Sequence, residues 1–126
     1  MSCSGGYVLI IDDDVEIRSS LTEIVGIDFG HNVKAARDGC EALGILSRSP
    51  APSFILVDLM MPGMDGPEFI ARKTQEPTLA DIPFCVMTAS VRWERTSLRS
   101  IFGREVPVLR KPFALEELLS LVERYC

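Results

Sequence analysis

The chain has 126 residues, of which 47% are hydrophobic and 25% charged, so it is long enough for one domain with a real core. Its formal net charge of −5 argues against direct binding to nucleic acid or to an anionic membrane. No apolar run approaches the ~18 residues that span a bilayer, and the N-terminus lacks the features of a signal peptide. Cys3, Cys40, Cys85 and Cys126 form no CxxC pair. We therefore expect free thiols and a cytoplasmic location.

Strand-like and helix-like patterns alternate from one end of the chain to the other. Short apolar runs predict buried strands at residues 7–11, 54–57, 83–88 and 106–110, and residues 32–36 are expected to form a short second strand. Apolar residues at helical spacing follow each run, as in the last helix with Leu115, Leu118, Leu119 and Val122. Such βα units imply an α/β fold, a doubly wound parallel sheet with helices on both faces. No linker or repeat interrupts the pattern. We expect a single domain over residues 1–126, with a core at about 7–125.

Polar residues stand at the ends of four of these predicted strands. Asp12, Asp13 and Asp14 follow the first strand, Asp58 the third, Thr88 the fourth and Lys111 the fifth. Ligand sites in open α/β sheets lie outside the carboxyl ends of the strands. The sequence therefore predicts that acids, a hydroxyl and an amine converge at one edge of the sheet.

The residue types at this edge suggest phosphate chemistry. Crowded carboxylates repel one another, and a hard divalent cation such as Mg²⁺ relieves that repulsion. Lys111 can pair with a carboxylate or a phosphoryl oxygen, and Thr88 offers a hydroxyl donor. Asp58 is a lone acid on a central strand, which makes it the best candidate for a nucleophile that forms an aspartyl phosphate.

Four segments resemble the receiver domains of two-component response regulators. Residues 8–14 (VLIIDDD) resemble the acidic motif of that family, and residues 57–66 (VDLMMPGMDG) resemble its phosphoacceptor loop. Thr88-Ala89 and Lys111-Pro112-Phe113 are similar to its two later motifs, in the same order. The resemblance runs from about Tyr7 to the last helix. It implies a five-stranded parallel sheet of flavodoxin-like order 2-1-3-4-5, flanked by five helices.

The resemblance also implies a reaction and its metal. Asp58 would accept a phosphoryl group from a phosphohistidine on a histidine kinase or a histidine phosphotransfer protein. Asp13, Asp58 and the backbone carbonyl of Met60 would hold Mg²⁺ or Mn²⁺, with Asp12 assisting partly through water.

Further roles concern the response to phosphorylation. Thr88 and Lys111 would contact the phosphoryl group, the Lys111–Pro112 peptide would be cis, and the positions of Met60 and Ser90 would tune hydrolysis. A downstream protein would bind the face made by the fourth helix, the fifth strand and the last helix. Val108 departs from the family, which often has an aromatic residue there. The switch is therefore expected to rely on movement of the loop from Ala89 to Arg92.

Several other polar residues have a simpler structural interpretation. Asp14 is expected to cap the first helix, and Asp65 to serve the turn before Gly66 and the start of the helix that follows. His31 is the only histidine, and it is expected to be a solvated turn residue far from the site.

A cluster of arginines follows the fourth strand. Arg92, Arg95, Arg99 and Arg104 are interspersed with acids, so we expect a solvated or partner-facing surface rather than a nucleic-acid site. Trp93 could pack against the domain or anchor a partner.

Three functions fit these residues. The leading one is a phosphorylation-controlled binding module, which is not an enzyme beyond its own phosphorylation and dephosphorylation. A Mg²⁺-dependent phosphohydrolase is disfavoured because Met60 stands where such enzymes place a second acid. A phosphate-independent scaffold would be favoured by a missing acid or lysine, and none is missing. Because the chain ends right after the last helix, both a stand-alone receiver and a module of a larger protein fit.

Overall fold

Five parallel strands form the centre of the molecule. The computed structural model describes residues 6–89 and 95–125, and its sheet has the order β2-β1-β3-β4-β5. The strands are β1 (Val8–Ile11), β2 (Val33–Ala36), β3 (Phe54–Asp58), β4 (Phe84–Thr88) and β5 (Val108–Arg110). Every neighbouring pair is parallel. The predicted fold class and strand order are confirmed.

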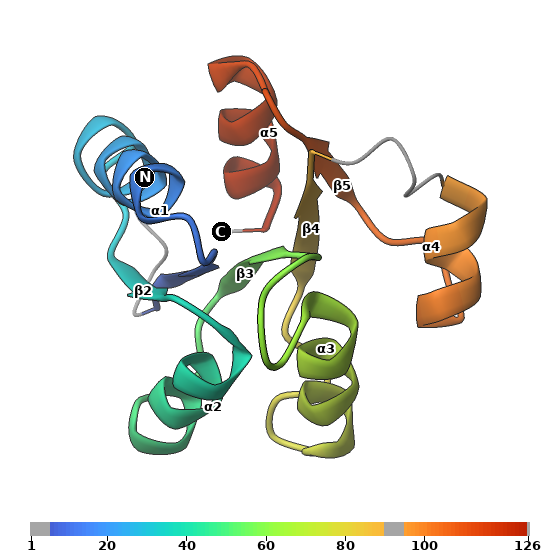
Figure 1. Cartoon of the computed structure of the whole chain (residues 1–126). Coiled ribbons are helices and arrows are strands. Elements are labelled where there is room, and N and C mark those ends of the chain that lie inside the picture. Colours follow the sequence, from blue (N-terminus) through green and yellow to red (C-terminus); the bar gives the residue numbers. More distant parts are fainter. Residues whose placement is uncertain (1–5, 90–94, 126) are drawn as a thin grey trace.

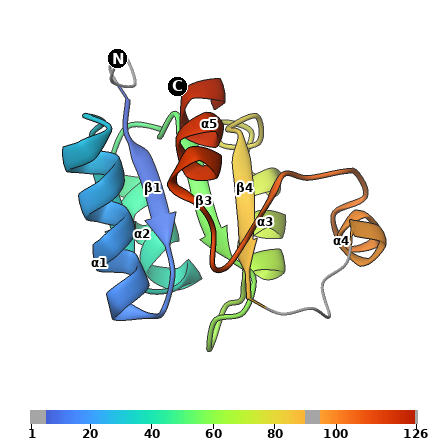
Figure 2. The ribbon, with the colours of Figure 1, turned by 90° about the horizontal axis from the view of Figure 1, so that it is seen from above.

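Helices cover both faces of this sheet. They are α1 (Val15–Glu23), α2 (Gly39–Arg48), α3 (Gly66–Gln75), α4 (Arg95–Phe102) and α5 (Leu115–Tyr125), with a π-helical turn, η1 (Ile24–Asp28), after α1. Figure 1 shows α1 and α5 on one face, α2 and α3 on the other, and α4 beyond β5. Seen from above, β1 and β3 end at the same edge (Figure 2). Within the described residues, every helix is too short or too polar to span a bilayer.

The core has two layers, one on each side of the sheet. Leu9 and Ile11 of β1 point into the layer that holds buried residues of α2 and α3, such as Phe69. Val8 and Ile10 point into the layer that holds buried residues of α1 and α5, such as Leu118. Both faces of the strand are buried, which explains why it is a continuous apolar run rather than an alternating one.

Aspartates cap α1 and α3, the helices that follow β1 and β3. Asp14 Oδ1 accepts hydrogen bonds from the backbone N–H groups of Glu16 and Ile17, at 2.9 and 3.4 Å. Asp65 Oδ1 accepts from the Glu68 N–H group at 2.9 Å. These bonds satisfy N–H groups that the first helical turn leaves without a partner. The predicted capping roles of Asp14 and Asp65 are confirmed.

The segment after α1 differs from the prediction. His31 was expected to be solvated, but only 6% of its surface is exposed. The wider η1 turn closes with the Phe29 N–H group bonded to the Ile24 carbonyl at 2.9 Å. The chain then folds back, so that the His31 N–H group bonds to the Val25 carbonyl at 3.1 Å. Burial lowers the pKa of His31, because the charged imidazolium loses its hydration.

A buried lysine lies at the far end of α3. Lys73 is fully buried, and its Nζ donates to the Ala80 carbonyl at 3.0 Å. The same ammonium lies 5.3 Å from the centre of the Phe84 ring. Carbonyl and ring together replace part of the lost hydration, although burial still lowers the pKa of Lys73.

Candidate phosphoacceptor site

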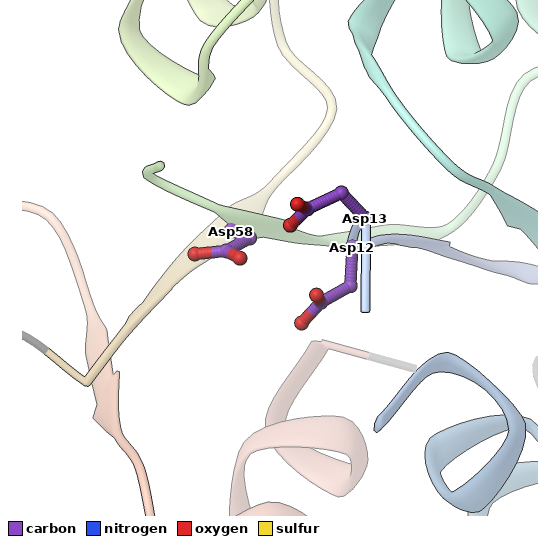
Figure 3. A group of neighbouring side chains, drawn as sticks. All are labelled: Asp12, Asp13 and Asp58. Carbon is purple, nitrogen blue, oxygen red and sulfur yellow. The ribbon is translucent and has the colours of Figure 1, made fainter. Parts of the chain in front are cut away.

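Three carboxylates gather where β1 and β3 end. Asp12 and Asp13 follow β1, and Asp58 is the last residue of β3. One ligand oxygen from each lies within 4.8 Å of the others (Figure 3). Asp12 and Asp58 are buried, whereas Asp13 is exposed to solvent. The two strands pair directly in parallel, with Ile11 opposite Val57, and this register places the acids side by side.

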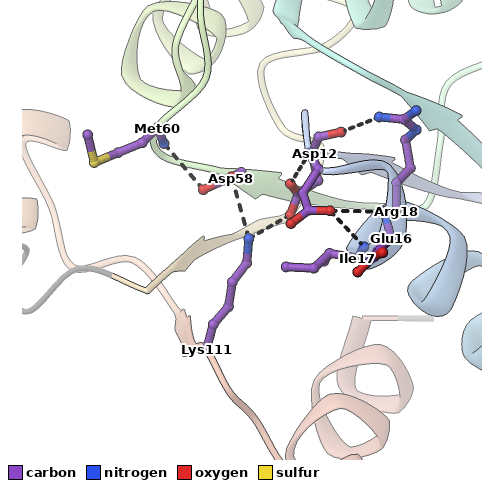
Figure 4. Close-up of polar contacts among 8 residues, drawn as sticks. Asp12, Glu16, Ile17, Arg18, Asp58, Met60 and Lys111 are labelled. Atoms are coloured by element: carbon purple, nitrogen blue, oxygen red, sulfur yellow. Dashed lines mark hydrogen bonds and ion pairs between the residues drawn. The ribbon is translucent and has the colours of Figure 1, made fainter.

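Lys111 is the cation of this cluster. Its Nζ lies 2.7 Å from Asp12 Oδ2 and 3.4 Å from Asp58 Oδ2 (Figure 4). Burial lowers the pKa of Lys111, but the hydrogen bonds and charges of the two carboxylates outweigh that effect and hold the pKa above its ordinary value. Lys111 is therefore a fixed positive charge at the site. The Lys111–Pro112 peptide is cis, as expected.

Opposing effects at Asp58 bring its pKa to about 6, close to neutral pH. Burial raises the pKa of Asp58, the charge of Lys111 lowers it, and the neighbouring Asp12 raises it, with a result of about 6. The Met60 N–H group donates to Asp58 Oδ1 at 3.3 Å. At neutral pH Asp58 is mostly ionised, and its carboxylate is held at an energetic cost in the metal-free protein.

A small pocket opens over Asp58. It has a volume of about 300 Å³ and is lined by Asp58, Met60, Thr88, Ala89 and Lys111. Thr88, the last residue of β4, is buried, and its carbonyl accepts from the Lys111 N–H group at 2.9 Å. The Met60 side chain is 54% exposed at the rim. An acid, a hydroxyl and an amine thus face one cavity, as the strand-end pattern predicts.

Gly66 keeps the loop after β3 close to the strand. Its N–H group donates to the Leu59 carbonyl at 3.0 Å. A Cβ atom at this position would lie 2.6 Å from the carbonyl oxygen of Asp58, closer than side-chain carbons approach. Only glycine fits here without moving the backbone that carries the Asp58 carboxylate.

The structure adds one residue that the sequence interpretation missed. Arg18 of α1 donates from Nη1 to the main-chain carbonyl of Asp12 at 2.8 Å (Figure 4). Its position on the first turns of α1 was the available signal. However, an arginine there is equally compatible with a solvated helix face.

Some predicted residues are not tested by this geometry. Ser90, Arg92 and Trp93, and the side chain of Arg95, lie outside the part of the chain that the structure describes. Arg99 and Arg104 are exposed, and the Arg104 guanidinium lies 5.5 Å from the centre of the Phe84 ring. The roles expected for Met60 and Ser90 in hydrolysis stay predictions.

The donor set fits a divalent metal. Three carboxylates within 4.8 Å supply the hard oxygen ligands that such cations prefer. Asp12 and Asp58 are buried beside each other with a single ammonium between them, so negative charge is in excess. The acidic triad is therefore consistent with a divalent metal site.

Comparison with known proteins agrees with this geometry. Two mycobacterial proteins named "Response regulator MprA" are 37% identical (Mycobacterium sp. strain KMS) and 38% identical (Mycobacterium avium strain 104), each over 115 residues. The match covers 90% of this chain and 47% of each relative, so the chain spans about half the length of these curated relatives.

Solved structures show the same fold. The chemotaxis protein CheY4 of Vibrio cholerae superposes with a TM-score of 0.83 at 29% identity, covering 96% of this chain and 98% of CheY4. A signal receiver domain of a histidine kinase from Syntrophus aciditrophicus gives 0.82 at 29% identity, covering 95% of this chain and 89% of that one. The family model described as "Response regulator receiver domain" matches residues 8–123. The chain therefore belongs to the response regulator receiver domain family.

Proposed function

We propose that Asp58 accepts a phosphoryl group from a phosphohistidine on a histidine kinase or a histidine phosphotransfer protein. The observation that carries this proposal is the buried Asp58 carboxylate in a pocket of about 300 Å³, with Lys111 Nζ at 3.4 Å and Thr88 on the wall. As a receiver domain, the chain is a signalling module that catalyses only its own modification, and it implies a cognate histidine kinase.

The chain's own residues supply most of what this transfer needs. An oxygen of ionised Asp58 forms the new bond to phosphorus while the P–N bond of the phosphohistidine breaks. The electron pair leaves with the imidazole nitrogen, which takes a proton from solvent. Lys111 balances the charge that spreads over the phosphoryl oxygens, and the Thr88 hydroxyl donates to one of them.

The proposal includes a metal at the acidic triad. Asp12, Asp13, Asp58 and the backbone carbonyl of Met60 would hold Mg²⁺ or Mn²⁺. When bound, the cation would neutralise the carboxylates and offset the negative charge of the phosphoryl group. The lines of support are the short distances between the three carboxylates and the burial of Asp12 and Asp58.

The output surface is proposed to be the α4-β5-α5 face. Part of this face holds a groove of about 620 Å³, which is lined by residues of the β5 segment and α5, including Val108, Arg110, Glu117 and Arg124. Val108 is half-buried on β5. Because it is a valine, its side chain lacks the bulk and the reach of an aromatic switch residue. Charges of both signs suit a polar protein partner rather than nucleic acid.

The proposed location of the protein is cytoplasmic. Cys40 and Cys85 are free thiols, which suits a reducing compartment.

One assay tests the proposed reaction. The chain is mixed with acetyl phosphate and Mg²⁺, and its intact mass is measured over time. We expect a labile gain of one phosphoryl group that is lost in Asp58→Asn and retained in Asp65→Asn, a matched change at an exposed helix cap. Repeated turnover of a small phosphoester would favour a phosphohydrolase, and no modification would favour a phosphate-independent scaffold.

A further inference from the structure

Arg18 ties helix α1 to the last residue before the acidic turn. Its Nη1 donates to the Asp12 carbonyl at 2.8 Å, six residues back along the chain. We infer that Arg18 is a positioning residue that holds the Asp12–Asp13 turn in the geometry needed to bind a divalent cation. The inference rests on the proposed function, because it concerns the metal of that same site.

Asp12 is held at every polar group that it carries. Its N–H group donates to the Ala36 carbonyl at 3.1 Å, which continues the pairing of β1 with β2. Asp12 Oδ1 accepts from the Asp14 N–H group at 2.9 Å, and Oδ2 contacts Lys111 Nζ at 2.7 Å. The carbonyl is the remaining group, and it lies beyond the end of the ladder between β1 and β3. Arg18 supplies the hydrogen-bond donor that this buried carbonyl needs.

Arg18 is well anchored for this role. Its own N–H group donates to the Asp14 carbonyl at 2.9 Å, and its carbonyl accepts from Thr22 Oγ1 at 2.7 Å. The half-buried side chain therefore starts from a fixed backbone and closes a ring with the end of β1. Asp13 belongs to the segment of chain that this hydrogen bond closes. Loss of the Arg18–Asp12 hydrogen bond should make the position of the Asp13 carboxylate more variable. A cation would then have to order the turn when it binds, which costs affinity.

A role of Arg18 as a positive charge and a role as a hydrogen-bond donor predict opposite changes in cation affinity when the residue is replaced. If Arg18 acted only as a positive charge near the site, its removal would tighten the binding of a cation, because repulsion would fall. If it acts through the hydrogen bond to Asp12, its removal should weaken binding. The sign of the change in affinity therefore separates the two interpretations.

The experiment measures Mg²⁺ affinity of the full chain by titration calorimetry. Arg18→Met removes the charge and the donors but keeps the apolar stem. Arg18→Lys keeps a charge and a donor. Arg48→Ala is the control, because Arg48 is an exposed arginine in the last turn of α2. Amide exchange at Asp14 and the Mg²⁺ dependence of phosphorylation by acetyl phosphate are recorded for each variant.

We expect Arg18→Met to weaken Mg²⁺ binding by about tenfold, as is common when a group that orients a metal ligand is removed. Asp14 amide exchange should speed up, and the rate of phosphorylation at saturating Mg²⁺ should stay close to wild type. Arg18→Lys should recover most of the affinity, and Arg48→Ala should match wild type. If the methionine variant does not fold, Arg18→Gln replaces it, since it also lacks the charge and shortens the side chain.

Two results would overturn the inference, and they are distinguishable. Unchanged or tighter Mg²⁺ binding in Arg18→Met, with normal binding by wild type, would remove the role of Arg18 and leave the proposed function intact. A wild-type chain that takes up no divalent cation would remove the metal site itself, and the inference with it.

Discussion

Replacing Asp58 by asparagine should make the metal-free protein more stable, although it removes the proposed acceptor. Asp58 is 8% exposed and lies beside a second buried acid, Asp12. Burial raises its pKa from 3.8 to about 6, in spite of the opposing charge of Lys111. Asparagine has nearly the same shape as the protonated acid and carries no charge. The variant therefore avoids the cost that ionisation imposes on the folded state.

The size of this gain follows from the pKa. A rise from 3.8 to about 6, at roughly 1.36 kcal/mol per pH unit, corresponds to about 3 kcal/mol of stability that is lost when Asp58 ionises. Between these two pH values the folded state binds more protons than the unfolded state, so wild-type stability falls as the pH rises. Above about pH 6 the loss is complete. Below the unfolded pKa, near 3.8, Asp58 is protonated in both states and the gain should vanish.

Urea denaturation in EDTA at about pH 7.5 and about pH 4 measures the difference between wild type and Asp58→Asn at each pH. Asp65→Asn serves as the control, because Asp65 is exposed and asparagine also caps helices. Saturating Mg²⁺ should stabilise wild type far more than Asp58→Asn, since it binds only the intact triad. An equal gain at both pH values, or none at about pH 7.5, would refute the electrostatic reasoning.

Three further outcomes are expected. Lys111→Met leaves two buried carboxylates without their cation, so the metal-free protein should lose about 3 kcal/mol in a urea melt, and Mg²⁺ should recover more of it than it adds to wild type. Cys85 is fully buried and its pKa is raised from 9.0 to about 12, which leaves about a thousandfold less thiolate than an ordinary thiol has. Peptide mass spectrometry after iodoacetamide should therefore find exposed Cys40 alkylated long before Cys85. The pKa of His31 is lowered from 6.5 in the folded state, so the unfolded state binds the extra proton as the pH falls below that value, and stability should drop. A urea melt of His31→Gln should lack that drop, and an unchanged pH profile would contradict the role of burial.

Strand-end residues could be predicted because local pattern and sheet topology act together. The run before Asp58 is buried on both faces, so its apolar character is visible in the sequence alone. Parallel strands deliver their last residues to one edge, and that rule places Asp58, Thr88 and Lys111 together without any coordinates. The helix caps at Asp14 and Asp65 were equally accessible, since a cap depends only on neighbours within three residues.

The contacts that the sequence did not reveal join segments whose pairing no local pattern encodes. Lys73 resembles a solvated helix residue, yet it is buried because the turn after α3 places the Ala80 carbonyl and the Phe84 ring around its ammonium. His31 is buried because a π-helical turn folds the chain back toward α1. Arg18 of α1 reaches back across the turn after β1 to the Asp12 carbonyl.

The sequence by itself thus determined the order of the elements, the edge of the sheet that holds the site, and the residue types gathered there. Hydrophobic periodicity and short-range capping encode these features within a few neighbouring residues. Only the tertiary structure decided how far Asp58 is buried beside Asp12, and how the Lys111 ammonium is shared between their two carboxylates. These depend on distances between segments far apart in the chain, and on hydration lost when those segments pack.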